Sequence, residues 1–104
     1  MRLRPVLLSV VTLVLGGCGD DPRLTAGEEV FTKHCKVCHA QGINGAPIVG
    51  NQKMWGPRID QGHDVLVQHA INGFGLMPPR AGNPDLRDEE ISNAVFYMIS
   101  TVQQ

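Results

Sequence analysis

The residues of this chain with the most specific chemistry form one cluster, Cys35-Lys36-Val37-Cys38-His39. The two thiols lie three positions apart, which places them one helical turn apart on the same side of a helix. At that spacing they can reach the two vinyl groups on one edge of a porphyrin, and the imidazole that follows then faces the iron. The cluster therefore predicts one covalently attached haem c, with His39 as an iron ligand.

Three other interpretations of the cysteine pair are weaker. A thioredoxin-like redox motif needs a strand–helix–strand context, which the sequence does not indicate. A structural zinc site needs four ligands, yet no second cysteine pair exists, and His34, His63 and His69 do not have zinc-ligand spacing. A disulfide within the pair is the third alternative, and the histidine that directly follows the second cysteine favours haem over it.

The second axial ligand decides what such an iron does. Met77 lies in a Gly- and Pro-rich loop directly before Pro78 and Pro79. A thioether there would raise the reduction potential and close the iron to small ligands. Met54, which precedes a tryptophan in a loop, is a rival, and so is Met98 on the apolar side of the last predicted helix, where methionine commonly fills the core. A histidine in that position would instead give a bis-histidine centre of lower potential.

The beginning of the chain is typical of an exported protein. Arg2 and Arg4 precede an apolar run over residues 6–15, and small residues follow it. This is the pattern of a signal peptide. The run is too short for a transmembrane helix, since an α-helix of about ten residues reaches only about 15 Å.

A lipidated cysteine would also account for the cysteine count. The chain holds three cysteines, and a single free thiol outside the haem motif invites intermolecular pairing in an oxidising compartment. The segment Leu15-Gly16-Gly17-Cys18 resembles the bacterial lipobox; the alternative is an ordinary signal peptide that ends near a cysteine by chance. We therefore expect a signal peptide over residues 1–17, a lipidated Cys18 with its tether over residues 18–24, and one domain over residues 25–104.

Composition limits the partners and the core. The chain has nine Lys and Arg against ten Asp and Glu, and two of the basic residues lie in the predicted signal peptide, so the mature chain is acidic. Nucleic-acid binding, which needs a basic face, is not expected. The acidic excess either favours a basic partner surface or only aids solubility. A domain this small has a modest hydrophobic core and usually needs an additional stabilising group, such as a haem.

Three helices are predicted to position these groups, and no segment shows the alternation of a strand. Their expected ranges are residues 26–39, 62–72 and 87–102. The first would begin with Thr25 as its N-cap and Glu28 as the partner in a capping box. The segments between the helices, residues 41–61 and 73–86, are rich in Gly and Pro and are predicted to be loops. The fold class is therefore all-α.

Several short motifs, in this order, resemble the class I cytochromes c, and within them the small bacterial cytochrome c-five branch. The matching segments, besides the cysteine–histidine cluster, are Gly45-Ala46-Pro47, Trp55-Gly56-Pro57-Arg58-Ile59, Gly73-Phe74, Met77-Pro78-Pro79-Arg80 and Ala94-Val95-Phe96-Tyr97-Met98. The resemblance extends over about residues 25–100.

The resemblance implies the remaining members of the site. Met77 would be the second axial ligand, and the carbonyl of Pro47 would accept the ring hydrogen of His39. Trp55 and Arg58 would hydrogen-bond a haem propionate.

The resemblance also implies how the first and last helices meet. Gly27 and Phe31 would cross the last helix near Ala94 and Tyr97. Some members of the family carry a disulfide in the loop after the methionine, whereas no cysteine follows Cys38 in this chain.

The sequence thus predicts a small class I cytochrome c fold of about three main helices around one haem c, serving as a one-electron carrier and not as an enzyme. The expected location is the periplasm, attached to a membrane through Cys18. The protein would be a monomer that exchanges electrons with membrane-bound donor and acceptor proteins of a respiratory chain. Two alternatives stay open: a haem-based sensor or enzyme with an open sixth site, and a haem subunit of a larger respiratory complex.

Overall fold

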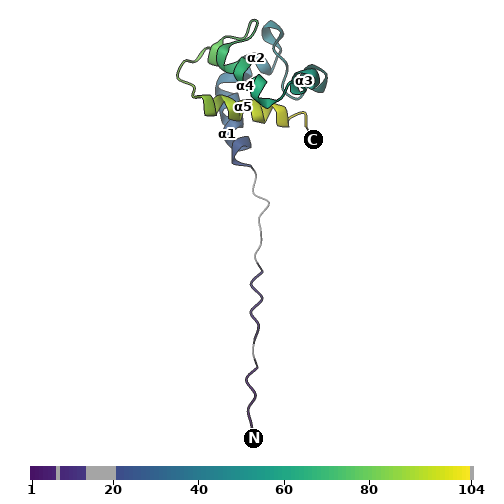
Figure 1. The fold of residues 1–104 in the computed structure, drawn as a ribbon, viewed down its shortest axis with the longest axis vertical. Helices are drawn as coiled ribbons and strands as arrows, with labels where there is room; N and C mark the ends of the chain where they lie inside the picture. The colour runs from purple at the N-terminus through teal and green to yellow at the C-terminus, as the bar shows by residue number, and fades with distance from the viewer. Residues whose placement is uncertain (7, 14–20, 104) are drawn as a thin grey trace.

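The computed structural model describes residues 1–6, 8–13 and 21–103. The predicted lipidation site, Cys18, lies outside these residues. The described residues before Asp21 form neither helix nor strand, and the helices all follow it (Figure 1). Every helix in the described part of the chain is too short or too polar to cross a membrane.

The domain is built from helices joined by short connections, as predicted for an all-α fold. In chain order the elements are α1 (Pro22–Val30), a π-helical turn (Phe31–Cys35), α2 (Lys36–His39), a 3₁₀ turn (Ile43–Gly45), α3 (Gln52–Ile59), α4 (His63–Asn72), a second 3₁₀ turn (Pro79–Gly82) and α5 (Asp88–Ser100). Within residues 21–103, extended pairing is confined to an isolated bridge between Phe74 and Met77.

The first helix begins four residues earlier than predicted. Asp21 is its N-cap, and the carboxylate accepts a hydrogen bond of 2.9 Å from the backbone N–H of Arg23. Pro22 occupies the first turn, where its fixed φ suits a helix and its missing N–H has no cost. The predicted capping box at Thr25 is therefore wrong, and residues 22–24, which were expected to belong to the tether, form the first turn of α1.

A wider turn interrupts this helix directly before the cysteine–histidine cluster. The N–H of Lys36 bonds to the carbonyl of Phe31, five residues earlier, instead of to the residue four positions back. Such a π-turn accommodates one extra residue and shifts the phase of the side chains that follow it. The phase of α2, and hence the direction of Cys38 and His39, is therefore set by this turn and not by a uniform α-helix.

The segment over residues 41–61 is not all loop, because it contains α3. The side chain of Asn51 caps this helix by accepting a hydrogen bond of 3.0 Å from the N–H of Met54. Gly56 and Pro57 lie inside it although both residues usually end helices. Pro57 lacks one N–H donor and so removes one hydrogen bond, and the buried ring of Trp55 fixes the helix against the core.

The two other predicted helices are present with nearly the expected bounds. The expected helix over residues 62–72 is α4, and the one over residues 87–102 is α5, which ends two residues earlier. At the start of α5 the carboxylate of Glu90 accepts a hydrogen bond of 3.1 Å from the N–H of Arg87. This contact fixes the first turn of a helix that has no Ser or Thr at its N-cap.

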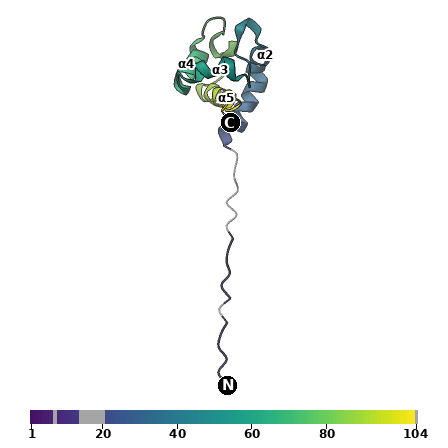
Figure 2. The ribbon, with the colours of Figure 1, turned by 90° about the vertical axis from the view of Figure 1, so that its right-hand side faces the viewer.

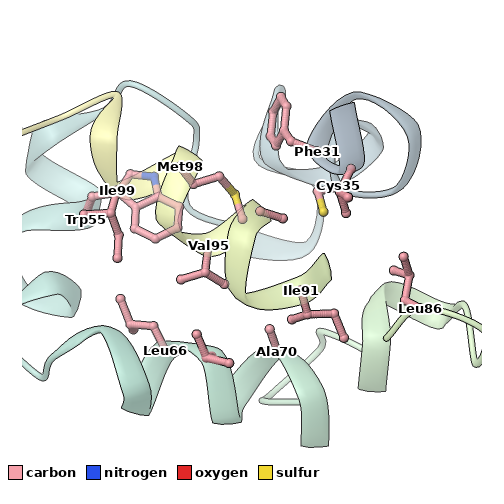
Figure 3. Close-up of a cluster of buried hydrophobic side chains, with 13 residues drawn as sticks. Phe31, Cys35, Trp55, Leu66, Ala70, Leu86, Ile91, Val95, Met98 and Ile99 are labelled. Atoms are coloured by element: carbon pink, nitrogen blue, oxygen red, sulfur yellow. The ribbon is translucent and has the colours of Figure 1, made fainter. Parts of the chain in front are cut away.

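The helix α5 is the centre of the domain. It runs between the α1–α2 segment on one side and α3 and α4 on the other (Figure 2). Its buried residues Ile91 and Val95 point toward Leu66 and Ala70 of α4, and Met98 lies on the side of α5 that faces the segment with Cys35 (Figure 3).

The crossing of α1 and α5 is the closest helix contact. Gly27 lies against the backbone of α5, where an added Cβ atom would be 2.0 Å from the carbonyl oxygen of Asn93. One turn later, the rings of Phe31 and Tyr97 pack with their centroids 5.3 Å apart. The helix crossing implied by the resemblance is thus confirmed. It depends on glycine at position 27, because a residue with a Cβ atom does not fit between the two backbones.

We expect the substitution Gly27→Ala to destabilise the haem-loaded protein. The added methyl group cannot fit without separating the two helices, and overpacking of this kind costs about 1–3 kcal/mol. Guanidinium titration followed by circular dichroism would measure the loss in the free energy of unfolding.

The matched control is Gly56→Ala, because an added Cβ atom there meets nothing within 4 Å. Replacing that helical glycine should be neutral or stabilising by up to about 1 kcal/mol. Equal stability of the Gly27→Ala protein and the original protein would contradict the role of the crossing.

Candidate functional site

A cavity of about 590 Å³ opens among the helices, a volume within the range of about 300–1,000 Å³ that small-molecule and cofactor sites occupy. The cavity is lined by all seven residues that were predicted from the sequence to form the haem site: Cys35, Cys38, His39, Pro47, Trp55, Arg58 and Met77. They come from the π-helical turn that ends at Cys35, from α2, the loop after it, α3 and the loop before α5. The fold thus gathers residues that are up to 42 positions apart in the chain.

The two cysteines of the cluster are both free thiols, with Cys35 buried and Cys38 half-buried. Burial raises the pKa of the Cys35 thiol to about 11, so this side chain is neutral near pH 7. The described residues contain no group of three or more His, Cys, Asp or Glu side chains arranged to hold a metal ion.

The imidazole of His39 is fixed by the loop that follows α2. Its Nδ1 lies 2.8 Å from the carbonyl oxygen of Pro47, and because a carbonyl only accepts, Nδ1 carries the proton. The backbone carbonyl of His39 also accepts a hydrogen bond of 2.7 Å from Val49. His39 is 8% exposed, and with Nδ1 engaged by Pro47, Nε2 is the ring nitrogen left to bind a metal. A ligating histidine usually has this second contact, which sets its tautomer and orientation.

The three candidate methionines occupy different environments. Met77 lies in the loop between α4 and α5, is partly buried and lines the cavity. Met98 also reaches the cavity, but it is 4% exposed and belongs to the hydrophobic core along α5. Met54 lies on α3 and is not among the lining residues. Of the three, Met77 is the residue that combines contact with the cavity and a place outside the helical core.

Trp55 and Arg58 face the cavity from α3, and both donate hydrogen bonds to the backbone. The indole N–H of Trp55 donates to the carbonyl of Ile48 at 2.9 Å, and Nη1 of Arg58 donates to the carbonyl of Met54 at 2.5 Å. In the described part of the chain Arg58 makes no ion pair with a carboxylate. A half-buried guanidinium with spare donors beside the cavity suits an anionic group.

The loop between α4 and α5 is held by residues to which sequence reasoning gave no role. Arg80 has a positive φ of 56°, and its guanidinium donates to the carbonyl of Leu86 and to Asp88, each at 2.6 Å. His69, which was considered from the sequence only as a zinc ligand, also lines the cavity. The motif around Met77 includes Arg80, but hydrogen bonds to residues six and eight positions later have no local sequence signal.

The residues around the cavity fit a covalently bound haem. Two thiols stand on one helical turn, an imidazole offers one free nitrogen, and a thioether comes from a separate loop. Most of the other lining residues are apolar, including Leu66, Ala70 and Val95. This donor set, one nitrogen and one thioether beside paired thiols, is that of a c-type haem rather than of a zinc ion.

Comparison with known proteins agrees with this chemistry. A family model described as cytochrome c oxidase, cbb3-type, subunit III matches residues 22–98. The chain is 41% identical over 78 residues to cytochrome c-555 of Chlorobaculum thiosulfatiphilum, covering 71% of this chain and 91% of that protein. It is 35% identical over 75 residues to cytochrome c5 of Ectopseudomonas mendocina, covering 70% of this chain and 86% of the relative.

A solved structure has the same fold. It is described as the crystal structure of an electron transfer complex of nitrite reductase with cytochrome c. The matching chain is 37% identical, with a TM-score of 0.72, and the match covers 80% of this chain and 98% of that one.

We expect the chain to lose most of its helical structure when no haem is attached. The double substitution Cys35→Ala/Cys38→Ala would leave an unfilled cavity of about 590 Å³ at the centre of a domain whose own core is small. Far-ultraviolet circular dichroism should show a large loss of helix and no cooperative thermal transition.

The control for this prediction is Lys36→Ala, since Lys36 is exposed between the two cysteines. That variant should keep the original helix content. Native helix content and cooperative unfolding in the double variant would mean that the polypeptide folds without the haem.

Proposed function

The chain belongs to the small class I cytochromes c, and on this premise we propose that it carries single electrons in the periplasm with His39 and Met77 as its iron ligands. Its cofactor is haem c, covalently bound and containing iron, and it is an electron-transfer protein and not an enzyme. The observation that carries the proposal is the cavity on which the cysteine pair, His39 and Met77 converge.

Each residue of the cluster has a separate task in this proposal. The thiols of Cys35 and Cys38 would form thioether bonds, and His39 would bind iron through Nε2 while Pro47 holds its other nitrogen. When bound, the haem supplies a reversible one-electron couple at its iron. Met77 would close the second axial position, and a thioether there favours a higher potential than a second imidazole.

We assign the hydrogen bond to a haem propionate to Arg58 in preference to Trp55. The guanidinium of Arg58 has donors left after its bond to Met54, whereas the indole of Trp55 has one N–H, which Ile48 already accepts. A cation at this position would offset the charge of a partly buried carboxylate. Trp55 would reach a propionate only by giving up its bond to Ile48.

The proposed location is the periplasmic side of a membrane. The segment over residues 1–17 would be removed as a signal peptide, and Cys18 would carry the lipid. Because α1 already begins at Pro22, only residues 19–21 remain as a link, which spans about 10 Å at most. The domain would therefore stay close to the lipid surface.

The proposed partners are redox proteins. A structural relative is described in an electron transfer complex with nitrite reductase, which supports docking with a soluble or membrane-bound redox protein. We infer a monomer that moves electrons between a membrane-bound donor and an acceptor of a respiratory chain. A lipid anchor would raise the effective concentration of the carrier near such partners.

A second candidate function is a haem subunit of a larger oxidase, because the matching family model is described as subunit III of a cbb3-type oxidase. The relatives named cytochrome c-555 and c5 favour the separate carrier, since this chain covers 91% and 86% of their lengths. Purification of the native protein at fixed stoichiometry with oxidase subunits would favour the second candidate.

We expect absorption spectra of the haem-loaded protein to report His/Met ligation. The ferric form should have the weak far-red band of a methionine–iron bond, and carbon monoxide should leave the ferrous spectrum unchanged. Met77→Ala should abolish the band and bind carbon monoxide, whereas Met54→Ala should do neither. A ferrous spectrum of the unaltered protein that shifts with carbon monoxide would point to a sensor or an enzyme instead.

We expect the substitution Cys18→Ser to release the protein from membranes. Two or three acyl chains give stable anchoring, and removal of the acylated thiol removes all of the proposed attachment. Cell fractionation with haem staining should find the original protein with the membranes and the variant in the soluble periplasm. Mass spectrometry of the purified protein provides the check: an unmodified Cys18 thiol would contradict the anchor.

A further inference from the structure

We propose that His69 is a positioning residue that holds the Met77 loop against α4 and thereby keeps the sulfur of Met77 on the iron. The inference rests on the proposed function, since His69 has this task only if Met77 is an axial ligand.

The first observation is the stacking of two rings beside the cavity. The rings of His69 and Phe74 lie face to face, with centroids 4.1 Å apart and planes at 16° to each other. His69 lies in the last turn of α4, and Phe74 belongs to the loop that follows. Phe74 is 61% exposed and is not part of the buried core cluster. Phe74 also lines the cavity, and the stack on His69 is a direct contact that attaches its ring to α4.

The second observation is that Phe74 and Met77 are joined through their backbones. The N–H of Phe74 donates to the carbonyl of Met77 at 3.1 Å, and the N–H of Met77 donates to the carbonyl of Phe74 at 2.9 Å. A pair that exchanges both hydrogen bonds moves as one unit. The position of the Phe74 ring on His69 therefore determines the position of Met77.

The third observation concerns where this unit could move. Gly73 and Gly75 flank Phe74 with positive φ angles of 84° and 56°, and glycine is the residue with the most backbone freedom. The other end of the loop is fixed, because the Arg80 side chain donates hydrogen bonds to the carbonyl of Leu86 and to the carboxylate of Asp88 in the first turn of α5. The stack on His69 thus restrains the end of the loop that would otherwise be free to turn away from the cavity.

The test measures how often the sulfur leaves the iron. Imidazole added to the ferric haem-loaded protein can bind only after Met77 dissociates, so its binding rate reports that event. For His69→Ala and for Phe74→Ala we expect rates about threefold to tenfold higher, the factor that corresponds to the contribution of one aromatic pair. The double variant should be no faster than the single ones, because both substitutions remove the same contact.

Two control variants separate positioning from a general loss of stability. His69→Phe keeps a ring on Phe74 and should restore the original rate. His63→Ala changes a histidine on the same helix whose ring packs edge-on against Phe96, and it should leave the rate unchanged. Phe74→Leu, at an exposed position, removes the ring and keeps an apolar side chain, and it serves as the second variant if His69→Ala does not fold.

The outcomes distinguish this inference from the proposed function. If the original protein has the methionine–iron band and the His69 and Phe74 variants bind imidazole at its rate, the inference is wrong and the proposed function stands. If the original protein lacks the band, or binds carbon monoxide in the ferrous state, His/Met ligation fails and the inference fails with it. A faster rate that His69→Phe does not restore would also overturn the positioning role.

Discussion

The architecture depends on a central volume that the polypeptide does not fill. Short segments, α2, α3 and two loops, surround a cavity of about 590 Å³, and such segments are rarely stable without a partner to pack on. The apolar faces of α4 and α5 also reach this volume through Leu66, Ala70 and Val95. The haem is thus as much a part of the core as any helix, and its covalent attachment makes that part of the core permanent.

The remaining direct helix packing is concentrated where α1 crosses α5. Gly27 brings the two backbones together, and Phe31 and Tyr97 continue the contact toward the cavity. The π-turn Phe31–Cys35 then follows at once. The continuous segment from α1 to α2 must therefore direct its side chains in two different ways. Its first part packs on α5, and its last turn points Cys38 and His39 into the cavity. The extra residue of the π-turn is the local adjustment between them.

Features that depend on residues close together in the chain could be predicted from the sequence, whereas features that depend on tertiary contacts could not. The cysteine–histidine cluster is a local pattern that indicates haem c, the cofactor of the family, and the local apolar stripes of α4 and α5 predicted both helices correctly. The start of α1 was missed because Thr25 and Glu28 fit a capping box, whereas Asp21 and Pro22 were assigned to the tether. The helix α3 was missed because Gly56 and Pro57 suggest a loop, whereas the burial of Trp55 in the core decides the outcome. The cavity contact of His69 arises only from tertiary packing.

The loop that carries Met77 is fixed by hydrogen bonds and not by a disulfide, since no cysteine follows Cys38 in this chain. Left-handed backbone at Arg80 and Ala81, which is unfavourable for residues with a side chain, is offset by the hydrogen bonds of the Arg80 guanidinium to Leu86 and Asp88. These bonds join the loop to the first turn of α5, the helix on which the core is built. A methionine on α5 itself, such as Met98, would be more rigid, yet its side chain is committed to the core. In the proposed function Met77 is a ligand on a loop that is restrained at its ends, and it would combine a free side chain with the defined position that an iron needs in order to change oxidation state without changing ligands.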